Sequence, residues 1–189
     1  MKIAITGGIG CGKSYVCQEL SKYGIEVYDC DAGAKRLMRS DANLRRSLVQ
    51  LVGKDVYDAQ GFLQKQVLAR YLLASDEHKQ AVNDIVHPAV ALDFEKSGKD
   101  WLESAILFDS GFIHRTHFDK VVCVTAPLEV RIQRIMARDD ISREKALEWI
   151  YAQLPQEEML RRSDFEIVND GEHDISSQVR MILETIQKV

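Results

Sequence analysis

The amino-terminal stretch constrains the fold of this chain more than any other. The apolar run KIAIT is followed at once by GGIGCGKSY, in which Gly7, Gly12, Lys13 and Ser14 fit the pattern G-x-x-x-x-G-K-[ST]. That pattern carries meaning only between a strand and a helix. The run before it is typical of a buried strand, and the residues after it recur with helical spacing. The sequence therefore predicts a strand, a glycine-rich loop and a helix in direct succession.

The residues that follow complete a first strand–helix–strand unit. Val16, Leu20 and Tyr23 recur at helical spacing, and Gly24 is a natural end for the helix. The run IEVYD then predicts a second strand. This order of elements is typical of a right-handed parallel crossover.

The glycine-rich loop predicts a nucleotide site. Glycines let backbone N–H groups turn toward phosphate oxygens, and the helix that begins near Gly12 adds its positive end. Lys13 would reach the β and γ phosphates, and the Ser14 hydroxyl would bind Mg²⁺. A flexible turn that binds nothing is the weaker alternative. We therefore expect a nucleoside triphosphate with Mg²⁺, held by consecutive residues: Gly8, Ile9, Gly10, Cys11, Gly12, Lys13, Ser14 and Tyr15.

The rest of the chain divides into helical and strand-forming parts. Between Ala32 and Lys99 the segments NLRRSLVQLV, QKQVLARYLLA and EHKQAVNDIV have helical periodicity. SAILFD, KVVCVTA and DFEIVN are predicted strands of a buried sheet, and ISSQVRMILETIQ is a predicted closing helix. We predict a single α/β domain in which helices flank a parallel sheet. Its expected parts are a core over residues 1–31, 100–128 and 164–189, a helical insertion over 32–99, and an arginine-rich lid region over 129–163.

Composition narrows the class of protein. The 189 residues suffice for one compact core, and the net charge of −4 argues against general binding to nucleic acid or a membrane surface. No apolar run approaches the roughly 20 residues of a spanning helix, and no secretory signal is recognisable. The four cysteines lack the spacing of a zinc site and are interpreted as free thiols in a reducing cytoplasm. Cys11 lies among backbone donors at a helix N-terminus, which predicts a lowered pKa and a reactive thiol.

Three aspartates follow predicted strands. Asp29 and Asp31 lie at the end of IEVYD, where open α/β sheets bind their ligands, and one of them could take a proton from an attacking hydroxyl. Alternatively, either aspartate caps the helix that starts near Ala32, and the residues leave the two interpretations even. Asp109 ends AILFD as a Walker B acid would, a pattern that also occurs commonly by chance.

An arginine-rich stretch follows the fourth predicted strand. Arg131, Arg134 and Arg138 share one helix face because they are three and four residues apart, and Arg161 and Arg162 follow later. A solvated face paired with nearby acids is the ordinary interpretation. Because a phosphate site is indicated independently, we favour a mobile lid that neutralises charge during phosphoryl transfer, with Arg138 as the leading candidate.

Two further residues keep open interpretations. His87 precedes Pro88 in the helical insertion, and a lone histidine there is more often packed or capping than a ligand; spacing does not separate these. Asn169 opens VNDG after the last predicted strand. This stretch could turn toward an adenine ring, which would bring Asn169 to the nucleotide, or form a plain Asx turn.

Together these motifs resemble those of the dephospho-CoA kinase family nearly end to end. The resemblance includes TGGIGCGKS, YDCDAGAKRL, GFLQKQVLARYLLA, NDIVHPAV, ILFDSGF, VVCVTAPLEVRIQRIMARDD and DFEIVNDG. The Asp-x-Asp strand end with a distant His-Pro distinguishes this family from other small P-loop kinases.

The resemblance implies ATP-dependent phosphorylation of the ribose 3′-hydroxyl of dephospho-CoA, giving CoA and ADP, on a nucleotide-kinase fold. It makes Asp31 the base that faces the acceptor hydroxyl, and Lys13 and Arg138 the charge stabilisers. It places His87 and Asp109 with the bound acceptor. No nucleic acid, membrane or obligatory protein partner is expected.

The chain departs from the family pattern at a few positions, none of which removes a group that the chemistry requires. Tyr15 replaces a threonine, Cys11 a common serine and Asp109 a glutamate, while Lys35 and Lys65 stand where arginine is usual. Two rival functions share the loop: another small-molecule P-loop kinase, of the nucleoside-monophosphate or shikimate type, and a nucleotide-dependent switch. The Asn-Lys-x-Asp guanine signature of GTPase switches is missing.

Overall fold

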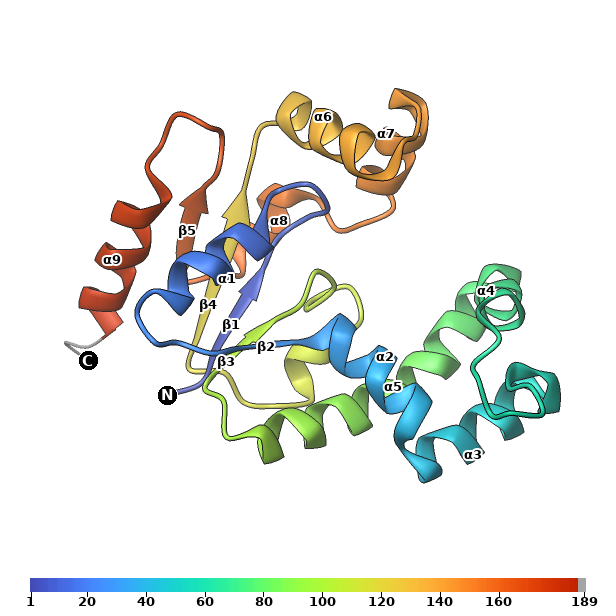
Figure 1. Ribbon diagram of the computed structural model, residues 1–189. Helices are drawn as coiled ribbons and strands as arrows, with labels where there is room; N and C mark the ends of the chain where they lie inside the picture. The colour runs from blue at the N-terminus through green and yellow to red at the C-terminus, as the bar shows by residue number, and fades with distance from the viewer. Residues whose placement is uncertain (187–189) are drawn as a thin grey trace. The chain divides into compact units, whose positions relative to one another are not determined.

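The computed structural model of the chain describes residues 1–186 (Figure 1). The chain forms two compact units. One combines Met1–Tyr28 with the chain from Lys99 onward, and the other is Asp29–Gly98. Within the described residues, no helix has both the length and the apolar character needed to cross a membrane.

A five-stranded sheet forms the centre of the first unit. In spatial order its strands are β2 (Val27–Asp29), β3 (Trp101–Glu103), β1 (Ile3–Thr6), β4 (Lys120–Thr125) and β5 (Phe165–Val168). The pairs β1–β3, β1–β4 and β4–β5 are parallel, so their carboxyl ends lie at the same edge. All four residues of β1 are buried, as expected for a central strand covered on both faces.

The predicted strand SAILFD is wrong, because the strand lies a few residues earlier in the sequence. The acid at the end of this strand is therefore a different residue from the one predicted. β3 ends at Glu103, whereas SAILFD continues as turns: Ser110 N–H donates to Ile106, and Gly111 N–H donates to Phe108. Leu107 is nevertheless fully buried. A short apolar run predicts burial, but its periodicity cannot distinguish a strand from a compact turn.

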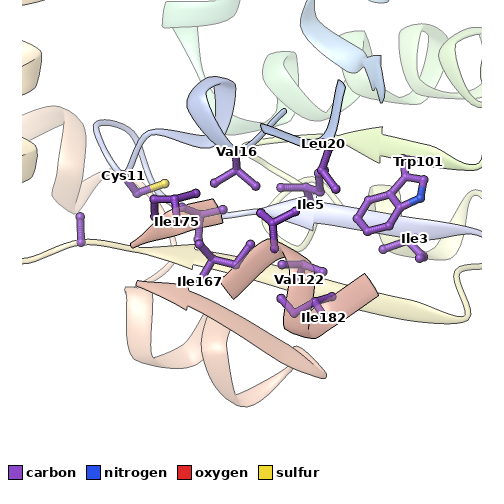
Figure 2. Close-up of a cluster of buried hydrophobic side chains, with 13 residues drawn as sticks. Ile3, Ile5, Cys11, Val16, Leu20, Trp101, Val122, Ile167, Ile175 and Ile182 are labelled. Atoms are coloured by element: carbon purple, nitrogen blue, oxygen red, sulfur yellow. The ribbon is translucent and has the colours of Figure 1, made fainter. Parts of the chain in front are cut away.

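Helices from both ends of the chain build the core of this unit. Figure 2 shows Cys11 at one end of the core cluster and Trp101 at the other. Between them, α1 (Lys13–Ser21) contributes Val16 and Leu20, and α9 (Ile175–Ile186) contributes Ile175 and Ile182. These side chains pack on β1, β4 and β5 through Ile5, Val122 and Ile167. The predicted helical face of α1 is confirmed at Val16 and Leu20, whereas Tyr23 lies beyond the helix and is exposed.

The arginine-rich region forms three helices of the first unit: α6 (Leu128–Asp139), α7 (Arg143–Tyr151) and α8 (Gln156–Arg161). A small core of Ile132, Ile135, Ala146 and Ile150 joins α6 to α7. The last helix, α8, packs against β4. The helical character expected from the charged stretch is therefore confirmed.

The second unit is helical, as the periodicity between Ala32 and Lys99 predicts. Its elements are α2 (Cys30–Ser40), α3 (Ala42–Val52), the 3₁₀ turn η1 (Lys54–Val56), α4 (Lys65–Ala74) and α5 (Asp76–Ser97). Leu44, Leu48, Val82 and Phe94 are among its buried side chains. A role for this unit in binding an acceptor stays a prediction.

Candidate phosphate-binding site

The loop between β1 and α1 needs glycine at three positions. Gly7, Gly10 and Gly12 have φ values of 143°, 80° and 87°, which residues with a Cβ adopt only with strain. Gly12 is the N-cap of α1, so the loop leads directly into the first turn of the helix. Among residues 1–186, no acceptor meets the amide N–H groups of Gly12 and Ser14. These donors and the helix N-terminus form a ready anion-binding cradle.

Lys13 is held over this loop by two contacts. Its Nζ donates to the Gly7 carbonyl at 3.0 Å and lies 3.6 Å from Oε1 of Glu103. The two side chains are only 12% and 18% exposed, so the pair is largely shielded from water. Glu103 stands at the carboxyl end of β3, where its register partner on β1 is Ile5. The ammonium group is therefore positioned before any ligand arrives.

Glu103 is a site residue that sequence reasoning missed. Because SAILFD was expected to be the strand, Asp109 became the acid at the strand end. The structure puts Asp109 in an exposed turn instead, where its Oδ2 accepts the N–H of Leu154 at 2.8 Å. Asp109 therefore does not end a strand as a Walker B acid would, and its functional role stays a prediction. The available signal was WLE itself, an acid directly after two buried apolar residues.

The expected metal ligand Ser14 is exposed in the first turn of α1. In the described part of the chain, no group of three or more histidine, cysteine or carboxylate side chains is arranged to hold a metal ion. A hydroxyl beside open amides fits Mg²⁺ that arrives with a phosphate, because Mg²⁺ takes most of its ligands from phosphates and water. The side chain of Tyr15, next along the helix, is also exposed.

Cys11 differs from its expected behaviour. All four cysteines are free, as predicted. The Cys11 side chain is fully buried, with its sulfur in the core cluster (Figure 2). Burial raises the pKa of the Cys11 thiol, and the nearby charges of Lys13 and Arg131 offset this only in part. The predicted lowered pKa is therefore wrong, because desolvation outweighs the effect of the helix N-terminus.

Two of the three aligned arginines reach the loop. Arg131 Nε donates to the Ile9 carbonyl at 2.9 Å, and Arg134 Nη1 approaches the Gly10 carbonyl at 3.4 Å. Arg138 lies at the end of α6, exposed, and its guanidinium pairs with Asp139 at 2.7 Å. A pair with a nearby acid such as Asp139 is what a solvated charged face predicts for Arg138. Arg161 and Arg162 both pair with Glu158.

Asn169, at the end of β5, joins the loop to α6. Its Nδ2 donates to the Cys11 carbonyl at 2.9 Å, and its Oδ1 accepts from Arg134 Nη2 at 3.1 Å. The Asx turn expected in VNDG is made by Asp170, whose Oδ1 accepts the N–H groups of Glu172 and His173. These donors lower the pKa of Asp170. Asn169 is thus beside the loop, while contact with a nucleotide stays a prediction.

The remaining candidates belong to the second unit. Asp29 is the N-cap of α2 and accepts the Ala32 N–H at 2.9 Å, so the capping interpretation is confirmed for this aspartate. Asp31 lies in the first turn of α2, exposed, in an ion pair with Lys35. His87 is buried within α5. The acceptor-facing roles of Asp31 and His87 stay predictions.

Comparison with known proteins gives a consistent result along the chain. A model of the dephospho-CoA kinase family matches residues 1–174. The dephospho-CoA kinase of Bacteroides fragilis is 42% identical over 186 residues, which cover 95% of this chain and 89% of that protein.

Solved structures share the architecture. A crystal structure from Thermus thermophilus has a TM-score of 0.82 at 33% identity and covers 98% of this chain and 97% of that one. Shikimate kinase from Acinetobacter baumannii, in complex with shikimate, has a TM-score of 0.58 at 15% identity, covering 99% and 93%. This second likeness concerns the fold. The α/β fold predicted from the glycine-rich loop is therefore confirmed as that of P-loop kinases.

Proposed function

The chain belongs to the dephospho-CoA kinase family, and we propose that it transfers the γ-phosphoryl group of ATP to the ribose 3′-hydroxyl of dephospho-CoA, giving CoA and ADP. The single observation that carries the proposal is the family match over residues 1–174. A preformed loop with Lys13 fixed above it supports the kinase chemistry. The free thiols support a cytoplasmic location, and so does the place of the family's reaction as the last step of coenzyme A biosynthesis.

Phosphates would bind at the start of α1. The open amides of Gly12 and Ser14 would donate to phosphate oxygens, and Lys13, already held above the loop, would reach the β and γ phosphates. The Ser14 hydroxyl would hold Mg²⁺, which when bound neutralises phosphate charge. Glu103 keeps the ammonium group of Lys13 aimed at the cradle.

The acceptor would bind through the second unit. We assign Asp31 as the base that takes the proton of the 3′-hydroxyl as the new P–O bond forms. Its ion pair with Lys35 is exposed, and such pairs contribute little stability, so the carboxylate can exchange partners. His87 and Asp109 would bind the acceptor. Arg138 would leave Asp139 and stabilise the charge on the transferred group.

An acceptor panel tests the function. Purified enzyme with ATP and Mg²⁺ is mixed with dephospho-CoA, a nucleoside monophosphate, shikimate or no acceptor, and ADP release is followed. Of these mixtures, we expect only the one with dephospho-CoA to release ADP rapidly. Its product should be dephospho-CoA that carries one additional phosphate at the 3′ position. Equal turnover of another acceptor would contradict the assignment to dephospho-CoA, and ADP release that needs no acceptor would indicate an ATPase or a switch.

A further inference from the structure

Side chains of the arginine-rich region form hydrogen bonds with both backbone polar groups of Ile9, in the phosphate-binding loop. The Ile9 N–H donates to Oε1 of Gln153 at 2.7 Å, and the Ile9 carbonyl accepts from Arg131 Nε at 2.9 Å. Arg131 belongs to α6, and Gln153 follows α7. The partners lie 144 and 122 residues away in sequence, so tertiary structure brings both of them to one residue.

Arg131 is a buried cation. It is 6% exposed, and in the described residues 1–186 no carboxylate forms an ion pair with it, although the charge of Glu157 acts on it from further away. Burial lowers the pKa of Arg131, and the charge of Glu157 offsets this only in part. Burying a guanidinium without an ion pair is costly, and an apolar side chain of similar volume is often as stable or more stable. Packing alone therefore does not explain the arginine.

The guanidinium of Arg131 occupies the space beside Gly8 where a side chain would begin. A Cβ on Gly8 would collide with Nη2 of Arg131, whereas its φ lies outside the left-handed region that favours glycine. Backbone conformation therefore does not require glycine at this position. A Cβ at this position would instead displace the guanidinium of Arg131, which lies against Gly8 while it binds Ile9.

We propose that Arg131 and Gln153 are positioning residues that clamp the backbone N–H and C=O groups of Ile9 and so hold the phosphate-binding loop in the shape that binds ATP. The inference rests on the proposed kinase function. Phosphoryl transfer depends on donors held within a fraction of an ångström, and a displacement of 1 Å can cost about 10²-fold in rate. The two hydrogen bonds also connect the loop to α6 and to the segment after α7, so a movement of these helices would displace Ile9.

The test is to separate stability from ATP binding. Arg131→Met fills the same space without a buried charge, so we expect its melting temperature to match or exceed that of the parent. Its Kd and KM for ATP should nevertheless rise on the order of 10-fold or more, while KM for dephospho-CoA stays within about twofold. Gln153→Ala, at a partly exposed position, should show the same ATP-specific change. Arg143→Gln is the matched control, because Arg143 pairs with Glu129 on the surface and makes no contact with the loop.

A double-mutant cycle tests the shared cause. Gly8→Ala should displace the Arg131 side chain and weaken ATP binding as Arg131→Met does, so Gly8→Ala/Arg131→Met should lose about as much as the worse single variant. Losses that multiply, or ATP binding that is unchanged in both Arg131→Met and Gln153→Ala, overturn the clamp. ATP affinity is measured by direct titration without an acceptor. A parent that binds ATP but fails to phosphorylate dephospho-CoA therefore overturns the proposed function and leaves the clamp test valid.

Discussion

The phosphate-binding loop and the start of α2 both carry residues assigned to the chemistry, but they hold them in opposite ways. Lys13 is mostly buried, bonded to Gly7 and close to Glu103 on a neighbouring strand. Asp31 is 75% exposed, and its partner Lys35 lies one turn further along the same helix. The first residue is fixed by the tertiary structure of its unit, and the second by its own helix.

This difference indicates which residue must be reoriented and desolvated when its ligand binds. A cation that is already desolvated and aimed at the cradle needs little reorganisation when phosphate arrives. A carboxylate on an exposed helix start must instead be desolvated and oriented by the acceptor itself. We therefore expect changes at the loop to affect ATP and the chemical step together, and changes at α2 to affect the chemical step with little effect on ATP.

The largest effect is expected at Lys13. Lys13→Ala removes the cation held above the loop, and we expect kcat to fall on the order of 10³–10⁵-fold, the range that an arginine finger contributes to phosphoryl transfer. The fold should remain, although Glu103 loses its shielded partner and the melting temperature should fall. The measurements are steady-state kinetics and a melting curve.

A double variant separates the two consequences of that substitution. Lys13→Ala/Glu103→Gln neutralises the stranded carboxylate, so it should regain the lost stability while staying inactive. Near-normal activity of Lys13→Ala with unchanged ATP affinity would contradict the assignment of the loop.

The next largest effect is expected at Asp31. Asp31→Asn keeps the shape of the side chain but cannot take a proton, so kcat should fall roughly 10²–10⁴-fold. ATP affinity and the melting temperature should stay close to the parent, because the carboxylate is exposed and its ion pair contributes little. Lys35→Met is the matched control, since it breaks the same ion pair and leaves the carboxylate. A kcat for Asp31→Asn within about threefold of the parent refutes the role of base.

These two regions also differ in how far the sequence could predict them. The motif around Lys13 is local: glycines, lysine and serine within eight positions, each required by backbone geometry or phosphate chemistry. The pattern therefore predicts the strand, the loop and the helix, and the structure confirms them. At α2 the pattern offered two aspartates with two equal interpretations, and a hydrogen bond to Ala32 was needed to assign the cap to Asp29.

What surrounds the loop could not be predicted in the same way. Glu103 was missed because SAILFD is apolar enough for a strand, whereas the chain buries Leu107 within a turn. Gln153 carries no motif, and its contact with Ile9 arises from tertiary packing between segments distant in sequence. Cys11 was predicted reactive from its place at a helix N-terminus, but the pattern does not reveal that its side chain points into the core.

The smallest effect is expected at Asp29, and it sharpens the contrast with Asp31 only two residues away. As an N-cap, Asp29 needs only an oxygen that accepts the Ala32 N–H, and asparagine supplies one as well as aspartate does. Asp29→Asn should therefore leave both stability and kcat close to the parent. Asp29→Ala removes the acceptor and should cost about 1 kcal/mol of unfolding free energy.

A second cap in the same unit gives the reference for that cost. Asp41 caps α3 and accepts the Leu44 N–H at 2.7 Å, so Asp41→Ala should lose a similar amount of stability on denaturant titration. If Asp29 is purely a cap, the kcat of Asp29→Ala should fall little in conditions where the protein stays folded, as for Asp41→Ala. A fall of 10²-fold in Asp29→Asn, with stability intact, would show instead that the proton leaves through Asp29. Because asparagine preserves the cap and removes only the basicity, this one substitution distinguishes a structural aspartate from a chemical one.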